Sequence, residues 1–290
     1  MNPTESPRRV DLGAGTALSR IVVPVTLDHV SDRGVVTATR LAERWGLPIQ
    51  LTSVATSVPD TIDLRLDENL ESAREALVAS NPYVKADRQL IAGGPDPVTS
   101  LASELSTGDL VIMASSGAGA DRRSMSFAQA LSHEWGGPIL MVGPNVDVSA
   151  SLEGDVVAAL DGSTVADPGI QAATGLAGAL GSRLRLVRVV PGSLTAQVER
   201  VRYRADQLSE AAYVLDLTKR TGLPSVTWEI IHGDDTATAL VEFVDATDAA
   251  FLAMATPAMF ALVRPAFGSI CTAVVQTATR PVIVIKPSRF

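Results

Sequence analysis

The sequence predicts an α/β protein made of two tandem doubly wound domains, each a five-stranded parallel sheet with flanking helices. Short β-branched runs alternate with amphipathic helical stretches, and the same order of elements occurs twice along the 290 residues. Aromatic residues make up 4% of the chain and apolar residues 46%. A core built mainly from Ala, Val, Leu and Ile suits buried parallel strands with helices packed closely on them.

The first half opens with a short β-branched strand over 21–25. Ser31 can cap a helix with apolar residues at helical spacing, and Gly46 can end it. Asp96 and Pro97 suit the cap and first position of a later helix. The remaining predicted elements are the strand 47–54, helix 68–79, strand 84–91, helix 97–105, strand 109–113, a helix after the loop 114–124, and the strand 138–142.

The second half repeats this order. The predicted elements are the strand 155–160, a helix from Asp167 that ends at Gly181, the strand 184–190, a long helix over 194–220, the strand 226–231, helix 235–244, strand 249–254, a helix from about Gly268, and the strand 281–285. An alternation of strands and helices predicts a parallel sheet with right-handed crossovers. This is the Rossmann-like or flavodoxin-like arrangement.

The repeat is positional as well as sequential. Gly46 and Gly181 are 135 positions apart, and Pro144 and Pro287 are 143 apart. An offset that grows slowly is expected if one unit was duplicated and its loops lengthened. We therefore predict a flexible N-terminal tail over 1–19, a first domain over 20–147 and a second over 153–290.

The charge balance and cysteine content narrow the functional classes. The formal net charge of −8 disfavours binding to nucleic acid. The single Cys271 leaves no partner for an internal disulfide and suits a reducing compartment. The sequence has no apolar run of transmembrane length and no signal-peptide pattern, so we expect no membrane association and a cytoplasmic location.

The repeated sheet also indicates where a ligand would bind. In open parallel sheets, ligands lie beyond the carboxyl ends of the strands where the strand order reverses. In the second half this rule selects the loop Asp161-Gly162-Ser163 and the longer loop that leads to Gly268-Ser269. A helix that starts at Gly-Ser offers backbone N–H groups, a hydroxyl and the positive end of its dipole, all suited to phosphate.

Here the chain resembles the universal stress protein family, in its tandem form and over nearly its whole length. The resemblance rests on the order of elements, on Leu160-Asp161-Gly162-Ser163, and on the final strand Pro281-Val-Ile-Val-Ile. Nucleotide-binding members carry a G-x2-G-x9-G-[ST] loop after the fourth strand. The second half keeps this spacing and the Gly268-Ser269 pair, but Ala255 and Ala258 stand at the two leading glycines.

The resemblance implies that Asp161 and the backbone near Val189 hold adenine and ribose, and that Gly268 and Ser269 hold phosphate. The ligand would be ATP or AMP, with Mg²⁺ accompanying a triphosphate; no protein-made metal site can be read from the sequence. The complete set of predicted nucleotide-binding residues is Asp161, Gly162, Ser163, Val189, Ala255, Thr256, Ala258, Arg264, Gly268 and Ser269.

The departures from the family pattern affect the two halves differently. A glycine in such a loop can adopt positive φ and approach phosphate closely, so the alanines weaken the second site without abolishing it. In the first half the same frame ends at Phe127-Ala128, and the Phe127 ring would fill the phosphate position. Thr26 also replaces the aspartate that the resemblance assigns to adenosine. We predict that the first half has lost nucleotide binding.

Other interpretations of the same residues stay open. Asp161-Gly162-Ser163 can be a tight turn that enters a helix, Gly268-Ser269 can be a simple helix cap, and Arg264 can be a solvated loop charge. The sequence has no G-x-S-x-G elbow and no phosphate-binding P-loop, so we expect no enzyme. The rival function is a duplicated scaffold that binds no nucleotide and acts through protein–protein association.

The resemblance also implies an assembly, because single domains of the family pair through their final strands. The apolar edge strands 138–142 and 281–285 need such cover. We expect them to pair within the chain as a pseudo-dimer, and we expect two chains to form a homodimer.

Overall fold

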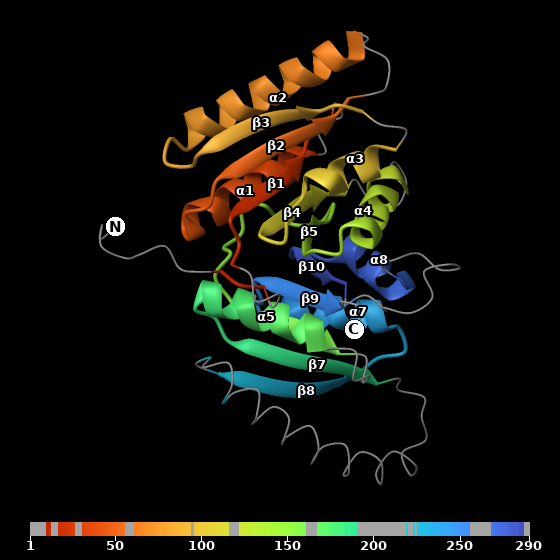
Figure 1. The fold of residues 1–290 in the computed structure, drawn as a ribbon. Helices are drawn as coiled ribbons and strands as arrows, with labels where there is room; N and C mark the ends of the chain where they lie inside the picture. The colour runs from red at the N-terminus through yellow and green to blue at the C-terminus, as the bar shows by residue number, and fades with distance from the viewer. Residues whose placement is uncertain are drawn as a thin grey trace, which may run out of the picture.

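The computed structural model describes residues 10–12, 17–26, 31–55, 61–93, 96–115, 122–160, 167–190, 219, 223, 225–255 and 268–286. These residues form one ten-stranded sheet with helices on both faces (Figure 1). The strands are β1 (Arg20–Pro24), β2 (Ile49–Val54), β3 (Ala86–Ile91), β4 (Asp109–Ala114), β5 (Ile139–Val142), β6 (Val156–Leu160), β7 (Leu184–Val190), β8 (Val226–His232), β9 (Phe251–Ala255) and β10 (Val282–Ile285). The helices are α1 (Ser31–Trp45), α2 (Thr61–Ser80), α3 (Pro97–Glu104), α4 (Arg122–Glu134), α5 (Asp167–Leu180), α7 (Thr236–Ala246) and α8 (Gly268–Thr277).

The strand order is β3-β2-β1-β4-β5-β10-β9-β6-β7-β8. Each half is therefore a parallel five-stranded sheet with the doubly wound order, which confirms the predicted fold class. Most predicted elements fall within a few residues of the observed ones, although α2 begins at Thr61, seven positions before its predicted start. The predicted helix over 194–220 lies outside the described residues, apart from Lys219.

Local sequence signals explain several element ends. The Asp96 carboxylate accepts hydrogen bonds from the backbone N–H groups of Val98 and Thr99, and the Asp235 carboxylate accepts one from Thr238 at 2.7 Å. These are N-caps of α3 and α7. Gly46 and Gly181 both have φ of +68° just after their helices, where a left-handed residue ends a helix. The predicted cap at Asp96 and the predicted helix ends at Gly46 and Gly181 are confirmed.

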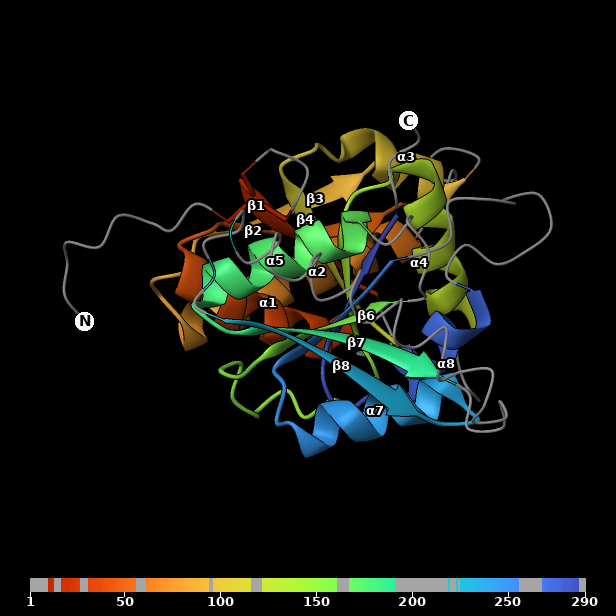
Figure 2. The same cartoon turned by 90° about the horizontal axis from the view of Figure 1, so that it is seen from below.

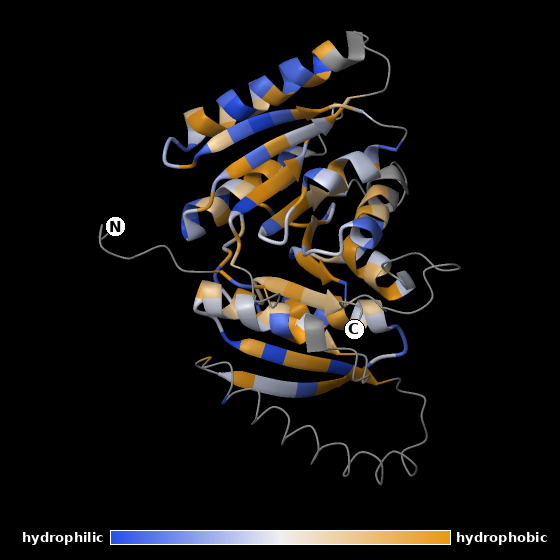
Figure 3. Ribbon diagram, viewed as in Figure 1, coloured by the Kyte–Doolittle hydropathy of each residue, from blue (hydrophilic) through white to orange (hydrophobic). Residues whose placement is uncertain are grey.

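Helices cover both faces of the sheet, and a separate cluster of buried side chains lies on each face. Buried side chains of α1, α2 and α5 pack on one face, and those of α3, α4, α7 and α8 pack on the other. Figure 2 shows the twist of the sheet from below, with β7 and β8 nearest the viewer. In Figure 3 the central strands are coloured as hydrophobic, whereas β3 at one edge carries hydrophilic residues. Strands that are buried on both faces need continuous apolar sequences.

The two halves join at the centre of the sheet. Strands β5 and β10 pair antiparallel, with Leu140 opposite Ile283, and this is the predicted pairing of the two final strands within the chain. A residue just beyond each final strand caps a helix of the other half: the Asn145 amide donates to the carbonyl oxygens of Gln276 and Thr277 at the end of α8. At the end of α4, Lys286 Nζ donates to the carbonyl oxygen of His133 at 2.8 Å. The halves therefore form one continuous sheet with an approximate two-fold axis at β5 and β10.

The N-terminal segment departs from the prediction. We expected residues 1–19 to be a flexible tail, and that is wrong for the described residues 10–12 and 17–19. Val10, Leu12 and Leu18 are buried in the core on the α1 and α5 face. The Leu18 N–H donates to the Val10 carbonyl oxygen at 2.6 Å, and the Ser19 N–H donates to the Gly108 carbonyl oxygen at 2.7 Å.

Candidate functional site

In the second half, the strand order reverses between β6 and β9. These two strands pair in parallel, with Ala159 opposite Met254, and their neighbours β7 and β10 lie on opposite sides of them. The two predicted ligand loops leave from the adjacent strand ends, Leu160 and Ala255. We call the carboxyl ends of β6 and β9 the switch-point edge. This is the position where doubly wound sheets bind ligands.

The first turn of α5 packs over the end of β9. A Cβ built on Gly169 would lie 2.9 Å from the Cβ of Ala255 and 3.2 Å from its backbone nitrogen. The methyl group of Ala255 is therefore directed at α5. The first half has a looser version of this contact, since a Cβ on Gly34 would lie 3.5 Å from the backbone nitrogen of Ala114. The alanine that replaces the first glycine of the family loop is accommodated by a glycine on the facing helix.

The start of α8 is a glycine with a left-handed backbone conformation. Gly268 has φ of +69°, and a Cβ built on it would meet no atom of the described residues within 4 Å. Ser269 and Ile270 follow on the exposed side of the first turn. Positive φ favours glycine, and the first N–H groups of a helix have no acceptor within the helix. The backbone conformation at position 268 therefore favours glycine, and no atom of the described residues stands where its Cβ would be.

The predicted role of Phe127 is wrong. Phe127 lies inside α4, half-buried, and packs on the core cluster beneath that helix. The reason is the register of the two halves: Gln129 Nε2 donates to Thr272 Oγ1 across the seam, and these residues are 143 positions apart. The same spacing aligns Phe127 with Ile270, two residues beyond Gly268. Helix α4 starts eight residues after β4 ends, whereas α8 starts thirteen residues after β9 ends, so counting through the loops misaligned the helices.

Four of the predicted nucleotide-binding residues belong to the part of the chain that the structure describes: Val189, Ala255, Gly268 and Ser269. Val189 is half-buried near the carboxyl end of β7 and pairs with Ile231 of β8. Ala255 ends β9, and Gly268 and Ser269 begin α8. The other six lie outside the described residues and stay predictions: Asp161, Gly162, Ser163, Thr256, Ala258 and Arg264.

Charged residues gather at the opposite, amino-terminal edge of the sheet, which sequence inspection missed. Asp109 is fully buried and makes a two-pronged ion pair with Arg20, at 2.8 and 2.9 Å. Its partner Arg20 is 89 positions away, so no local pattern indicates the pair. Hydrogen bonding to Asp109 is the main reason that the pKa of Arg20 is raised.

The equivalent edge of the second half carries a different ion cluster. Arg183 Nε and Arg185 Nε donate to the two carboxylate oxygens of Asp155, at 2.9 and 2.6 Å, and Arg185 also pairs with Glu229. Burial opposes ionisation of Asp155, but the hydrogen bonds from both arginines outweigh it and hold the pKa of Asp155 below its ordinary value. A carboxylate held charged in this way stabilises the folded state at neutral pH.

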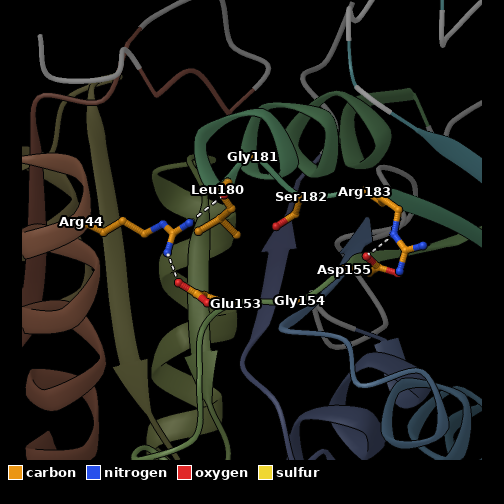
Figure 4. Close-up of a pocket in the computed structure, with 8 residues that line it drawn as sticks. All are labelled: Arg44, Glu153, Gly154, Asp155, Leu180, Gly181, Ser182 and Arg183. Atoms are coloured by element: carbon orange, nitrogen blue, oxygen red, sulfur yellow. Dashed lines mark hydrogen bonds and ion pairs between the residues drawn. The ribbon is translucent and has the colours of Figure 1, made fainter. Parts of the chain in front are cut away.

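A half-open hollow of about 360 Å³ lies beside this cluster, at the amino-terminal end of β6. Figure 4 shows its charged groups already paired: Arg44 reaches the Leu180 carbonyl oxygen at 2.7 Å and Glu153 at 3.6 Å, and Arg183 pairs with Asp155. Doubly wound sheets bind ligands at the carboxyl ends of their strands, so this hollow is on the wrong edge for a nucleotide.

The described residues contain no group of three or more His, Cys, Asp or Glu side chains placed to hold a metal ion. No helix formed by the described residues combines the length and apolar character needed to cross a membrane.

Comparison with known proteins supports the same fold. Residues 154–286 match the model of the universal stress protein family. A universal stress protein from Archaeoglobus fulgidus has a similar structure, with a TM-score of 0.64 and 20% identity over 93% of this chain and 98% of that chain. A protein of unknown function from Pseudomonas aeruginosa PAO1 gives a TM-score of 0.59 and 15% identity over 95% of this chain and 94% of that chain. A comparison with curated protein sequences found no match. The second half of this chain, residues 154–286, is therefore a domain of the universal stress protein family, and the whole chain has the fold of a tandem universal stress protein.

Proposed function

We propose that this chain is a universal-stress-type regulatory protein that binds an adenine nucleotide, ATP or AMP, in its C-terminal half. The observation that carries the proposal is the start of α8 beyond the switch-point edge. There Gly268 has a positive φ, and a Cβ built on it would meet no atom of the described residues within 4 Å. A phosphate group needs close approach to backbone N–H groups, and a glycine in this conformation permits it.

The neighbouring residues favour the same site. The Ala255 methyl group packs against Gly169 of α5, so the loss of the family glycine at this position is absorbed within the protein. Ser269, exposed in the first turn of α8, supplies a hydroxyl next to the phosphate position. Val189 lies near the end of β7, where the resemblance places adenine and ribose contacts. A triphosphate would bring Mg²⁺ with it and would need few protein ligands for the metal.

The proposed role is binding rather than catalysis. The residues assigned to the nucleotide would supply backbone N–H groups, a hydroxyl and a carboxylate from Asp161, which recognise and orient a ligand. In such a protein the occupied and empty forms differ in stability and surface, and that difference is the regulatory signal.

The scaffold is the second candidate, and the pairing of β5 with β10 favours it. This pairing places both final strands in the interior of the sheet. A homodimer of two such chains would therefore associate through a different surface. A duplicated protein of this kind can act as a rigid adaptor without any ligand.

The first test is to denature freshly purified protein and to assay the supernatant for adenine nucleotides by chromatography and mass spectrometry. We expect about one equivalent of ATP or AMP per chain, or a rise in melting temperature when ATP-Mg or AMP is added. The proposal is overturned, in favour of the scaffold, if nothing is released and neither nucleotide raises the melting temperature.

A matched pair of variants localises the site. Gly268→Ala places a side chain at φ of +69°, and Gly136→Ala places one at φ of +78° in the first half. A Cβ at either position meets no described atom within 4 Å, so the two variants carry similar backbone strain. We expect Gly268→Ala to weaken nucleotide binding and Gly136→Ala to leave it unchanged. Equal loss in both variants would show that strain, and not the α8 turn, controls binding.

A further inference from the structure

Residues 10–12 and 17–19, which we call the strap, lie against both halves of the molecule. The Ser19 N–H donates to the Gly108 carbonyl oxygen, just before β4 of the first half. At the other end, the Asp11 carbonyl oxygen rests on Gly175 in the middle of α5, in the second half. The strap therefore spans the seam on the face of the sheet that α1 and α5 cover (Figure 1).

The contact with α5 depends on a missing side chain. A Cβ built on Gly175 would overlap the carbonyl oxygen of Asp11. Backbone can approach a helix this closely only where the helix carries glycine. Three residues further along the same helix, a Cβ on Gly178 would meet its nearest described atom, Leu223 Cδ2, at an ordinary 3.7 Å. Gly175 is therefore a specific docking position for the strap.

Apolar anchors hold the strap in place. Val10, Leu12 and Leu18 are 1%, 6% and 7% exposed and join the core cluster that contains residues of α1 and α5. A short internal bridge between Asp11 and Ala17 and the hydrogen bond from Leu18 to Val10 fold the strap back on itself. Burial of three apolar side chains gives a segment of this length a defined docked state.

A second set of contacts closes the same seam independently. Arg33, on α1, donates to the carbonyl oxygens of Pro144 and Val146 in the connection between the halves. Arg40 Nη1 donates to the Val148 carbonyl oxygen at 2.6 Å, and Arg44 reaches Leu180 at the end of α5. Neither these arginine contacts nor the pairing of β5 with β10 involves a residue of the strap. The two halves are therefore held together by contacts that do not depend on the strap.

We propose that the strap is a releasable intramolecular clasp, which docks on α5 at Gly175 and closes the seam between the two halves. It opens as a unit while the ten-stranded sheet stays intact. Among the described residues, the contacts of its docked state include three buried side chains, the approach of the Asp11 backbone to Gly175, and hydrogen bonds from the Ser19 N–H and Oγ to the Gly108 carbonyl oxygen. The central strands are held by ladders of hydrogen bonds and a core on both faces. Segments with few contacts open locally at lower free energy than the core around them.

Hydrogen exchange of the full-length protein tests the clasp. We expect Gly175→Ala to speed exchange of the Leu18 and Ser19 amides by about tenfold or more, while amides of β5 and β10 keep their protection. Gly178→Ala is the control, because it makes the same change in helix propensity on the same helix without touching the strap. It should leave the Leu18 and Ser19 amides unchanged.

A variant on the strap itself keeps the test decisive if Gly175→Ala folds poorly. Leu12→Asp removes an anchor and leaves α5 unaltered, so it should release the same two amides. The proposal is overturned if both variants leave the Leu18 and Ser19 amides protected. It is also overturned if the β5 and β10 amides lose protection together with them, since the strap would then not be a separate unit.

Discussion

The contact between Gly169 and Ala255 yields a sharp prediction about packing at the switch-point edge. In Gly169→Ala, the new methyl group would lie 2.9 Å from the Ala255 Cβ and 3.2 Å from the backbone nitrogen of that residue. Carbon atoms pack at about 3.5–4.0 Å, so α5 must move away from β9 by roughly half an ångström or more. The equivalent change in the first half, Gly34→Ala, meets its nearest atom at 3.5 Å and requires no movement.

The two substitutions differ mainly in this overlap. Alanine in place of glycine favours a helix by about 1 kcal/mol at an interior position, and by less in a first turn. Overpacking in a well-packed site costs about 1–3 kcal/mol. We therefore expect Gly34→Ala to be neutral or stabilising, and Gly169→Ala to be less stable than Gly34→Ala by about 1–3 kcal/mol. The double variant Gly169→Ala/Ala255→Gly lacks the Ala255 methyl group that the new side chain would overlap. It should therefore recover most of the stability that Gly169→Ala loses.

Thermal unfolding measures this difference, at about 2 °C or more per kcal/mol for a protein of this size. A double-mutant cycle with Gly169→Ala, Ala255→Gly and both together isolates the pairwise term. Two results would refute the reasoning: Gly169→Ala has the same melting temperature as Gly34→Ala, or Ala255→Gly does not restore the stability of Gly169→Ala. Either result would show that the Ala255 methyl group does not face α5.

Three further predictions concern ionisation and reactivity. Asp109→Asn breaks the ion pair with Arg20 and should lower the free energy of unfolding, measured in urea, by about 3 kcal/mol or more. The control Asp67→Asn removes the partner of Arg88 in a partly exposed pair and should lower it by about 1 kcal/mol or less. Equal losses in the two variants would contradict the role of the buried Asp109. The paired arginines hold the pKa of Asp155 in the folded protein below its value in the unfolded chain. The stabilisation from ionised Asp155 is therefore complete above about pH 4 and is lost as the pH falls further. Asp155→Asn should make the free energy of unfolding less dependent on pH in this acid range. An unchanged acid limb would refute this. Burial raises the pKa of Cys271 to about 12, so a thiol reagent at pH 8 should react with it only after denaturation, and rapid labelling of native protein would show that the thiol is accessible.

The fold was predictable because its signals are local and occur twice. Hydrophobic periodicity placed the strands and helices, and residues such as Asp96 and Gly181 marked element ends through their own backbone chemistry. The resemblance to the universal stress protein family, with the apolar edge strands of both halves, then indicated that the final strands would pair. The position of Gly268 at the start of α8 followed from the same local reasoning.

What sequence reasoning missed depends on contacts between distant segments. Val10 and Leu12 stand in a polar stretch without periodicity, and only the tertiary structure shows that they dock on α5. Arg20 and Asp109 are 89 positions apart in the sequence and meet because β1 and β4 are neighbours in the sheet. The error over Phe127 came from counting residues through loops of unequal length, because a loop fixes the distance along the chain but not the register of the helix that follows.

The antiparallel seam at β5 and β10 changes what evolution can do with this protein. In a symmetric homodimer, each residue near the two-fold axis faces its own copy, so every substitution is made twice and must be compatible with itself. Fusion removes that constraint. Here an amide from Asn145 caps one seam helix and an ammonium group from Lys286 caps the other, and Gln129 meets Thr272 where a homodimer would place two identical side chains. Each half is then free to acquire or lose a ligand without a matching change in the other, so a single chain can combine one binding domain with one domain kept for its shape.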